Sequence, residues 1–343
     1  MVSRNRLSKW LVVSAQAGTT ERSARWSNPC LRHGELFGTY DHHRDVAGFS
    51  LAIAAADPAR PVARHTHEDA HFILLLDGHH VLPGVAAPAF DYLTDLAPFA
   101  NDGAQKAAIT IEDLLTMSSA LDCNDDDDAS PAADLPVRAD YQRDASGRGP
   151  WHYCTAGVFL LGQILQRAAR EPVDRVMASY LFAPLGITAW EFSRSPAGEI
   201  MTGGGLRLRT RDLASFARLM LTRGAWAGTQ VVPADFVRAA LTVHRDAMPE
   251  QHYGYLFWTR DYKTPCGTAT GWFMGGNGGN AIVLFVDLDA VVVVTRTSYN
   301  TRGMHQQTTR LIEEQILPEL ACRDGARRVA RSEDAAERAP GQS

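Results

Sequence analysis

The sequence contains very little lysine. Arginine supplies 31 of the 34 basic side chains in 343 residues, and the three lysines are Lys9, Lys106 and Lys263. None of them follows a serine at a distance of three residues, so the chain has no Ser-x-x-Lys. An amine one helical turn after a serine can take part in proton transfer and activate the hydroxyl as a nucleophile. The sequence excludes this way of making a nucleophilic serine.

Paired cysteine motifs are also missing. The cysteines are odd in number, form no Cys-x-x-Cys pair and are scattered along the chain, at Cys30, Cys123, Cys154, Cys266 and Cys322. That pattern excludes a zinc finger and a small disulfide scaffold. A single bridge, for instance between Cys123 and Cys266, is compatible with it.

Long apolar runs are missing as well. No run approaches the ~18 residues of a membrane-spanning helix. The apolar residues 10–13 that follow the basic N-terminus are too few for a secretory signal peptide. We therefore expect no membrane span and a cytoplasmic protein. The formal net charge of −5 gives no reason to expect nucleic-acid binding.

The composition that remains is typical of a soluble globular protein, with 45% hydrophobic and 21% charged residues. The length fits one large domain or two ordinary ones. Residues 1–35 show no periodic pattern and predict an irregular lead. Residues 36–84 predict β-structure, and the charged residues 321–343 predict a disordered tail.

Three histidines stand out in the predicted β-region. His65 and His67 are two positions apart, so their side chains lie on the same face of a strand. His71 follows four residues later, on that face if the strand continues. Imidazoles placed in this way can share one metal ion. Surface histidines on an edge strand are the alternative interpretation.

This histidine stretch resembles the metal-binding motif of cupins and the sensor domain that precedes the DNA-binding part of arabinose-type transcriptional regulators. His71 stands where cupins usually have glutamate. The resemblance covers residues 36–84 only, and no helix-turn-helix pair follows. It implies a cupin-like β-fragment that binds a divalent metal weakly, because a fragment of a barrel cannot close its own edges.

A helix is predicted after residues 151–157, because apolar residues recur there at helical spacing on one face: Val158, Leu161, Leu165 and Ala168. Thr155 is the predicted N-cap, and Pro172 predicts the end of the helix. Tyr153 precedes this helix, where partial positive charge stabilises an anion. A phenolate base suits that position, so Tyr153 is a candidate catalytic residue. A buried tyrosine at a turn is the alternative.

Other signals define the remaining elements. Thr110 and Asp113 predict a capping box, and Thr210 and Gly224 predict the ends of another helix. Pro233 predicts the first position of a further helix. The acidic run at residues 125–128 is interpreted as a solvated loop rather than a calcium site. Residues 280–286 and 290–297 predict a hairpin with a buried second strand, and residues 304–317 predict a closing helix.

Five stretches, in the same order over residues 89–320, resemble serine hydrolases related to class C β-lactamases and penicillin-binding proteins. They are ITIEDLLTMSSAL at residues 109–121, YCTAG at 153–157, LFAPLG at 181–186, GGLRLRTRDL at 204–213 and GNGGN at 276–280. The resemblance implies an α+β fold of the β-lactamase/transpeptidase type. In that fold, helices flank an antiparallel sheet, a helical subdomain is added, and the site lies between them.

The same resemblance implies roles for five residues. Tyr153 corresponds to the general base or acid, and Thr155 stands where the family has a substrate-contacting asparagine. Asn277 stands for the lysine or histidine of the third motif. Gly278 and Gly279 would let the backbone approach the substrate and offer an N–H to an oxyanion. No cofactor is implied for this part of the chain.

The nucleophile is where the chain departs from this family. The region that would carry Ser-x-x-Lys holds the cupin-like stretch instead. Residues 85–320 are thus expected to lack the nucleophile helix and the first strands, with an incomplete core. Ser118 and Ser119 are the candidate replacements, although helix packing also explains them.

Three functions remain open from the sequence. The first is a serine hydrolase that acts on a small ester, amide or β-lactam. The second is a catalytically impaired relative, either a binding protein or a fused product. The third is a metal or small-ligand sensor that uses His65, His67 and His71. The sequence does not indicate the oligomeric state.

Overall fold

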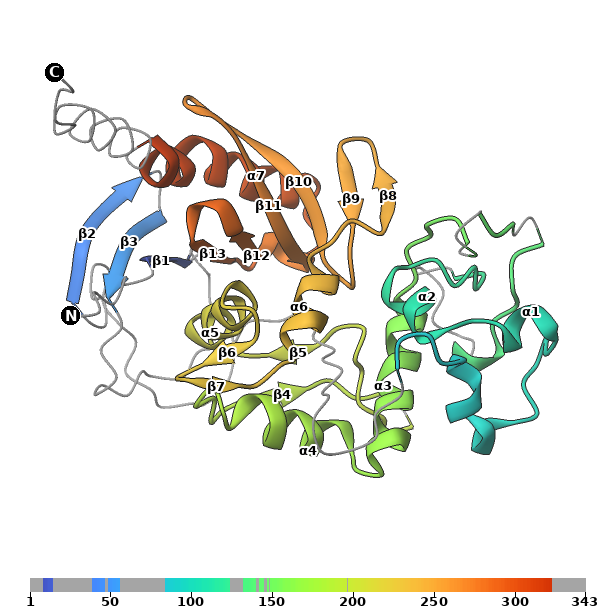
Figure 1. The fold of residues 1–343 in the computed structure, drawn as a ribbon. Helices are drawn as coiled ribbons and strands as arrows, with labels where there is room; N and C mark the ends of the chain where they lie inside the picture. Colours follow the sequence, from blue (N-terminus) through green and yellow to red (C-terminus); the bar gives the residue numbers. More distant parts are fainter. Residues whose placement is uncertain are drawn as a thin grey trace, which may run out of the picture.

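A nine-stranded sheet forms the centre of the fold (Figure 1). In this computed structural model its strands lie in the order β2-β3-β1-β13-β12-β11-β10-β9-β8. Neighbouring strands are antiparallel, except that β1 and β13 are parallel. The strands are β1 Lys9–Ser14, β2 Thr39–Val46, β3 Phe49–Ala55, β8 Arg245–Met248, β9 Gln251–Tyr253, β10 Trp258–Thr264, β11 Gly267–Gly276, β12 Asn280–Phe285 and β13 Ala290–Thr295.

The structure describes residues 84–322, apart from 124–131, 140, 141, 145, 146, 148 and 196. Of the earlier residues it describes only the backbone of strands β1, β2 and β3. The acidic run at residues 125–128 and the tail beyond residue 322 therefore lie outside the described residues.

Strands β2 and β3 fall where β-structure was predicted, within residues 36–84, but strand β1 differs from the prediction. Strand β1 falls within residues 1–35, which were expected to be irregular, and it pairs with β13. Strands β2 and β3 continue the same sheet. The first strands of the sheet are therefore present, contrary to the expectation that they are missing. No separate cupin-like fragment is supported by these strands, and residues 56–83 are outside the described part.

The hairpin β12–β13 forms the middle of the sheet, as predicted. The valines at positions 291–294 are at most 3% exposed, which confirms that this strand is buried on both faces. Successive side chains of a strand point to opposite faces. The odd-numbered valines pack in the cluster that contains α5 (Thr210–Leu221). The even-numbered ones pack against α7 (Met304–Leu311) and the π-helical turn Ile312–Ile316.

The helical part lies on the side of the molecule away from β1–β3 (Figure 1). Its helices are α1 Ala104–Ala107, α2 Ile111–Leu115, α3 Thr155–Ala169, α4 Val173–Met177 and α6 Ala234–Ala240. A π-helical turn, Ala178–Phe182, continues α4. Two short hairpins accompany these helices, namely β4 Glu191–Phe192 with β5 Leu206–Arg207 and β6 Ala225–Trp226 with β7 Thr229–Gln230. The remaining turns are 3₁₀-helical, at Ala89–Tyr92, Thr94–Leu96, Ala132–Asp134, Asn277–Gly279 and Val286–Leu288, with a last π-helical turn at Pro318–Cys322.

The predicted capping box of α2 is confirmed. The Thr110 hydroxyl accepts the Asp113 N–H at 3.1 Å, and the Asp113 carboxylate accepts the Thr110 N–H at 2.9 Å. The start of α5 was predicted one residue too late, because Arg209 is its N-cap and the Thr210 hydroxyl contacts Thr295 Oγ1 of β13 at 3.1 Å. Pro233 is the N-cap of α6 rather than its first helical residue.

Helix α5 ends in a Schellman turn, and its end was predicted one residue too late, with Gly224 rather than Arg223 as the first residue after the cap. Arg223 takes the left-handed position with φ 55°, and its N–H bonds to the Met220 carbonyl at 3.1 Å. The Gly224 N–H bonds to the Leu219 carbonyl at 2.7 Å. Gly224 is therefore the second residue after the cap. A Cβ at this position would lie 2.0 Å from the Val232 carbonyl oxygen, so only glycine fits without a backbone shift.

Candidate functional site

The residue Tyr153 stands two positions before the first residue of α3. Cys154 is the N-cap of this helix, because its backbone is extended and its Sγ accepts the Gly157 N–H at 3.1 Å. The prediction that Thr155 is the N-cap is wrong by one residue, since Thr155 already belongs to the helix. Helix α3 ends at Ala169, before Pro172 as predicted. The N-terminal end of a helix favours negative charge, so the chain places Tyr153 where an anion is stabilised.

Two disulfides join the described cysteines. They pair Cys123 with Cys154 and Cys266 with Cys322. The suggested bridge between Cys123 and Cys266 is therefore wrong. Spacing alone could not distinguish among these pairings, because the fold brings together cysteines that lie 31 and 56 positions apart. The first bridge links Cys154, the residue next to Tyr153, to Cys123. Disulfides persist mainly in oxidising compartments, so they do not favour the cytoplasmic expectation.

Aromatic rings surround Tyr153. Its ring stacks on Trp258 with centroids 5.9 Å apart, and it lies 6.3 Å from the ring of Trp151. The rings of Trp151 and Trp258 each pack edge-on against the ring of Tyr253, with centroids 5.9 and 5.0 Å away. Burial raises the pKa of Tyr253 well above its usual value, and nearby Tyr153 raises it further. Trp151 and Tyr153, which precede α3, therefore pack against Tyr253 of β9 and Trp258 of β10.

A small cavity lies beside these rings. Its volume is about 10 Å³, close to the space needed for one water molecule. It is lined by Met117, Tyr153, Val158, Tyr253, Leu256, Trp258, Met274 and Gly275. A substrate must therefore displace side chains to reach Tyr153 here. The sheet side of the cavity is made by Met274 and Gly275 of β11 together with Tyr253 of β9 and Trp258 of β10.

The predicted substrate residues Asn277, Gly278 and Gly279 form the turn between β11 and β12. The Asn277 side chain donates to Asn300 Oδ1 at 2.9 Å and accepts the Asn300 N–H at 3.0 Å. It also accepts the Gly278 N–H at 2.8 Å, and this N–H lies 3.1 Å from Met304 Sδ. These contacts give Asn277 and Gly278 a role in closing the turn. Their role in substrate binding, like that of Thr155 and Gly279, stays a prediction.

The candidate serines are buried. Ser118 is fully buried and its Oγ lies 2.8 Å from Thr116 Oγ1, while Ser119 is 3% exposed. Thr116 Oγ1 in turn donates to the backbone carbonyl of Glu112 at 2.7 Å. Both serines therefore pack at the end of α2, and neither presents a hydroxyl to a substrate.

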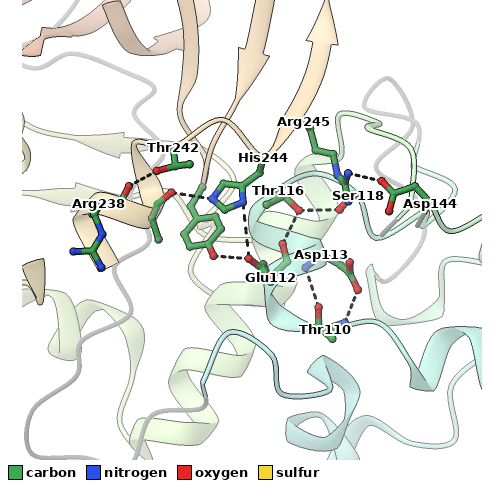
Figure 2. A network of polar contacts seen from close by, with 12 residues as sticks. Thr110, Glu112, Asp113, Thr116, Ser118, Asp144, Arg238, Thr242, His244 and Arg245 are labelled. Atoms are coloured by element: carbon green, nitrogen blue, oxygen red, sulfur yellow. Dashed lines mark hydrogen bonds and ion pairs between the residues drawn. The ribbon is translucent and has the colours of Figure 1, made fainter. Parts of the chain in front are cut away.

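A polar network joins α2 to His244, which lies between α6 and β8, and to Tyr255, which lies between β9 and β10 (Figure 2). The Tyr255 hydroxyl donates to Glu112 Oε1 at 2.6 Å, and His244 Nδ1 lies 4.0 Å from the same oxygen. The His244 ring stacks on Tyr255 with centroids 4.5 Å apart. His244 Nε2 lies 2.9 Å from the Ala239 carbonyl, so Nε2 carries a proton in this arrangement. The network acts as a tether between the helical part and the sheet.

The sequence analysis missed this network and the neighbouring Arg245, which pairs with Asp144 at 2.7 Å (Figure 2). The partners are far apart in the chain, with 143 positions between Glu112 and Tyr255 and 101 between Asp144 and Arg245. No local motif marks such pairs. The one available signal was the pair of adjacent polar residues His244 and Arg245 within an otherwise β-prone segment.

The predicted metal ligands His65, His67 and His71 lie outside the described residues. Within the described part of the chain, no group of three or more histidine, cysteine, aspartate or glutamate side chains is arranged to hold a metal ion. The metal site of the cupin-like stretch therefore stays a prediction.

This chain belongs to the β-lactamase family, whose profile matches residues 57–316. The match covers most of the chain and spans strands β8–β13 of the sheet as well as the helical part. It also begins before residue 85, where the sequence analysis placed the start of the related domain. The predicted family and the predicted β-lactamase/transpeptidase type of fold are therefore confirmed.

A curated relative of similar sequence is also a hydrolase by name. The chain is 27% identical over 227 residues to a 6-aminohexanoate-dimer hydrolase from Paenarthrobacter ureafaciens, covering 60% of this chain and 55% of the relative. It thus spans about half the length of that curated relative.

Two solved structures share the fold. One is a Bacillus anthracis protein provisionally described as a 6-aminohexanoate-dimer hydrolase, with a TM-score of 0.50, 15% identity and coverage of 67% and 68% of the two chains. The other is a hydrolase with promiscuous acyltransferase activity, with a TM-score of 0.51, 14% identity and coverage of 67% and 78%.

Among the residues that the structure describes, no helix is long and apolar enough to cross a membrane.

Proposed function

We propose that this β-lactamase-family protein holds a small ester, amide or β-lactam near Tyr153 and is catalytically impaired, so that no covalent acyl-enzyme forms. The observation that carries the proposal is the chain's lack of Ser-x-x-Lys. The burial of Ser118 and Ser119 supports it, because a nucleophile must reach the substrate carbonyl.

The positions of the lysines support the same proposal. Lys106 is 1% exposed, and its Nζ donates to the carbonyls of Ala100 and Ala133 at 2.8 and 2.9 Å. Lys263 lies five positions along β10 from Trp258, the ring that stacks on Tyr153, which is about 17 Å along a strand. Neither of these two lysines supplies an amine to Tyr153.

Tyr153 would then act on a ligand by binding rather than by covalent chemistry. Its hydroxyl can donate a hydrogen bond to a carbonyl oxygen, and the stacked ring of Trp258 restricts its orientation. Positioning without a nucleophile gives affinity for a ligand but no intermediate. The name of the curated relative suggests a linear amide, the 6-aminohexanoate dimer, as one ligand to test.

Rapid-mixing kinetics test the proposal. A chromogenic β-lactam and an activated ester should release no burst of product, and the 6-aminohexanoate dimer should remain intact. Tyr153→Phe keeps the ring and removes the hydroxyl, so it should weaken noncovalent binding of the dimer by about fivefold. A burst that approaches one product per chain, absent from Tyr153→Phe, would overturn the proposal.

A further inference from the structure

The two disulfides of the described residues differ in their exposure to solvent. Cys123 and Cys154 are 9% and 2% exposed, and both pack in the larger hydrophobic cluster. Cys266 is exposed and Cys322 is partly exposed, and neither packs in a hydrophobic cluster of the described residues. A thiolate must reach a disulfide sulfur in order to attack it, so access favours reaction at the second bridge.

Cys266 lies at the tip of the hairpin that β10 and β11 form. Thr264 and Gly267 are the last paired residues of the two strands, and residues 265–268 are all exposed. The Thr264 hydroxyl donates to the Gly267 carbonyl at 2.8 Å and accepts the Cys266 N–H at 3.1 Å. These bonds close the turn without the disulfide, so the turn can persist when the disulfide opens.

Cys322 is the last residue of the π-helical turn Pro318–Cys322, which continues the closing helix and is bridged to the hairpin tip (Figure 1). Leu317 and Leu320 anchor this end of the helix. They are 0% and 8% exposed and pack in the cluster that contains Tyr262 of β10. Burial of these side chains does not depend on the bridge.

Glu313 provides a further contact between the closing helix and β10. Its Oε1 accepts the Lys263 N–H at 3.0 Å and lies 3.6 Å from Arg260 Nη2. The helix is therefore held to the sheet by polar and apolar contacts besides the bridge. Opening of the bridge is thus a local event that does not require the chain to unfold.

We propose that the bridge between Cys266 and Cys322 is a modification site at which a low-molecular-weight thiol is exchanged onto Cys266. The thiolate attacks Cys266 Sγ and forms a new disulfide with it, while the bond between Cys266 and Cys322 breaks. Cys322 leaves as a thiolate and takes a proton from the solvent. No oxidant is consumed, because one disulfide replaces another. The inference goes beyond the proposed function and is independent of it, because neither cysteine lines the cavity beside Tyr153.

Incubation of the full chain with reduced glutathione in oxygen-free native buffer tests the proposal. Free thiols are trapped with N-ethylmaleimide at intervals, and the unreduced peptides are mapped by mass spectrometry. Glutathione should appear on Cys266 together with an alkylated Cys322. This bridge should open at least about tenfold faster than the buried bridge between Cys123 and Cys154. In urea that unfolds the chain, the two rates should converge, because both bridges are then exposed.

The double variant Cys266→Ser/Cys322→Ser is the matched control. It should take up glutathione at less than about a tenth of the rate of the parent chain, because only the buried bridge remains. Circular dichroism establishes that the variant is folded. If it does not fold, the comparison of the two bridges within the parent chain decides the question.

Four results would each overturn the proposal. They are equal opening rates of the two bridges in native buffer, a rate difference that persists in urea, glutathione on Cys322 but not on Cys266, and no opening of the bridge between Cys266 and Cys322.

Discussion

At the scale of single residues, glycine at position 278 is explained by its backbone and by its neighbours. Gly278 has φ +87°, and a Cβ there would lie 2.9 Å from the Tyr299 ring. Gly186 has a similar φ of +70°, but a Cβ there would meet no atom within 4 Å. A side chain at position 186 would therefore meet only the cost of the left-handed backbone, whereas one at position 278 would also meet the cost of a clash.

Alanine substitution at these two glycines should give different losses of stability. Gly186→Ala should lower the free energy of unfolding by about 1–2 kcal/mol, the usual cost of a left-handed residue with a Cβ. Gly278→Ala adds the clash with Tyr299 and should lower it by about 1–3 kcal/mol more. Urea denaturation measures both. Equal losses would show that the turn at Asn277–Gly279 can relax around a side chain.

At the scale of elements, the tether formed by Glu112, His244 and Tyr255 holds α2 against the segment that leads to β8. The side chains of Glu112 and His244 are 19% and 13% exposed, so solvent screens their contacts only in part. Tyr255 is 6% exposed. The backbone adds to the same tether, because the Leu256 N–H donates to the Leu115 carbonyl at 3.0 Å.

Removing the Tyr255 hydroxyl tests the tether. Tyr255→Phe removes the hydrogen bond to Glu112 Oε1 and should lower the free energy of unfolding by about 1–2 kcal/mol. Tyr92→Phe is the control, because the Tyr92 hydroxyl has no hydrogen bond within the described residues, and it should change stability by less than about 0.5 kcal/mol. Chemical unfolding measures both, and similar losses would contradict the tether.

Elements whose signals are local could be predicted from the sequence. The capping box at Thr110, the β12–β13 hairpin and the closing helix depend on neighbouring residues, and the structure confirms them. Cap positions were wrong by one residue at Thr155 and Thr210, because any of several adjacent residues can serve as a cap. The disulfides, the tether and the ion pair between Arg245 and Asp144 depend on residues far apart in the chain, so local patterns could not reveal them.

The histidine stretch carries a prediction of weak metal binding. His65, His67 and His71 supply three imidazoles without a fourth ligand from a complete barrel, so any divalent metal should bind weakly. Metal analysis after dialysis should find well under one ion per chain. Stoichiometric metal that survives dialysis and is lost in His65→Ala would contradict this expectation.

At the scale of the whole molecule, the sheet and the helical part meet around Tyr153. Trp151 and Tyr153 come from the approach to α3, whereas Tyr253 and Trp258 come from β9 and β10. The two parts of the fold therefore meet at Tyr153, while the Ser-x-x-Lys pair is absent from the sequence. The proposed function predicts binding without acylation at this junction.

Intact mass spectrometry tests that claim most directly. The full chain is incubated with a chromogenic β-lactam or an activated ester and weighed alongside the Tyr153→Phe variant. We predict an unchanged mass for both proteins, because the chain has no Ser-x-x-Lys and the two candidate serines, Ser118 and Ser119, are buried. A stoichiometric acyl adduct that maps to one serine, and that Tyr153→Phe abolishes, would contradict the account.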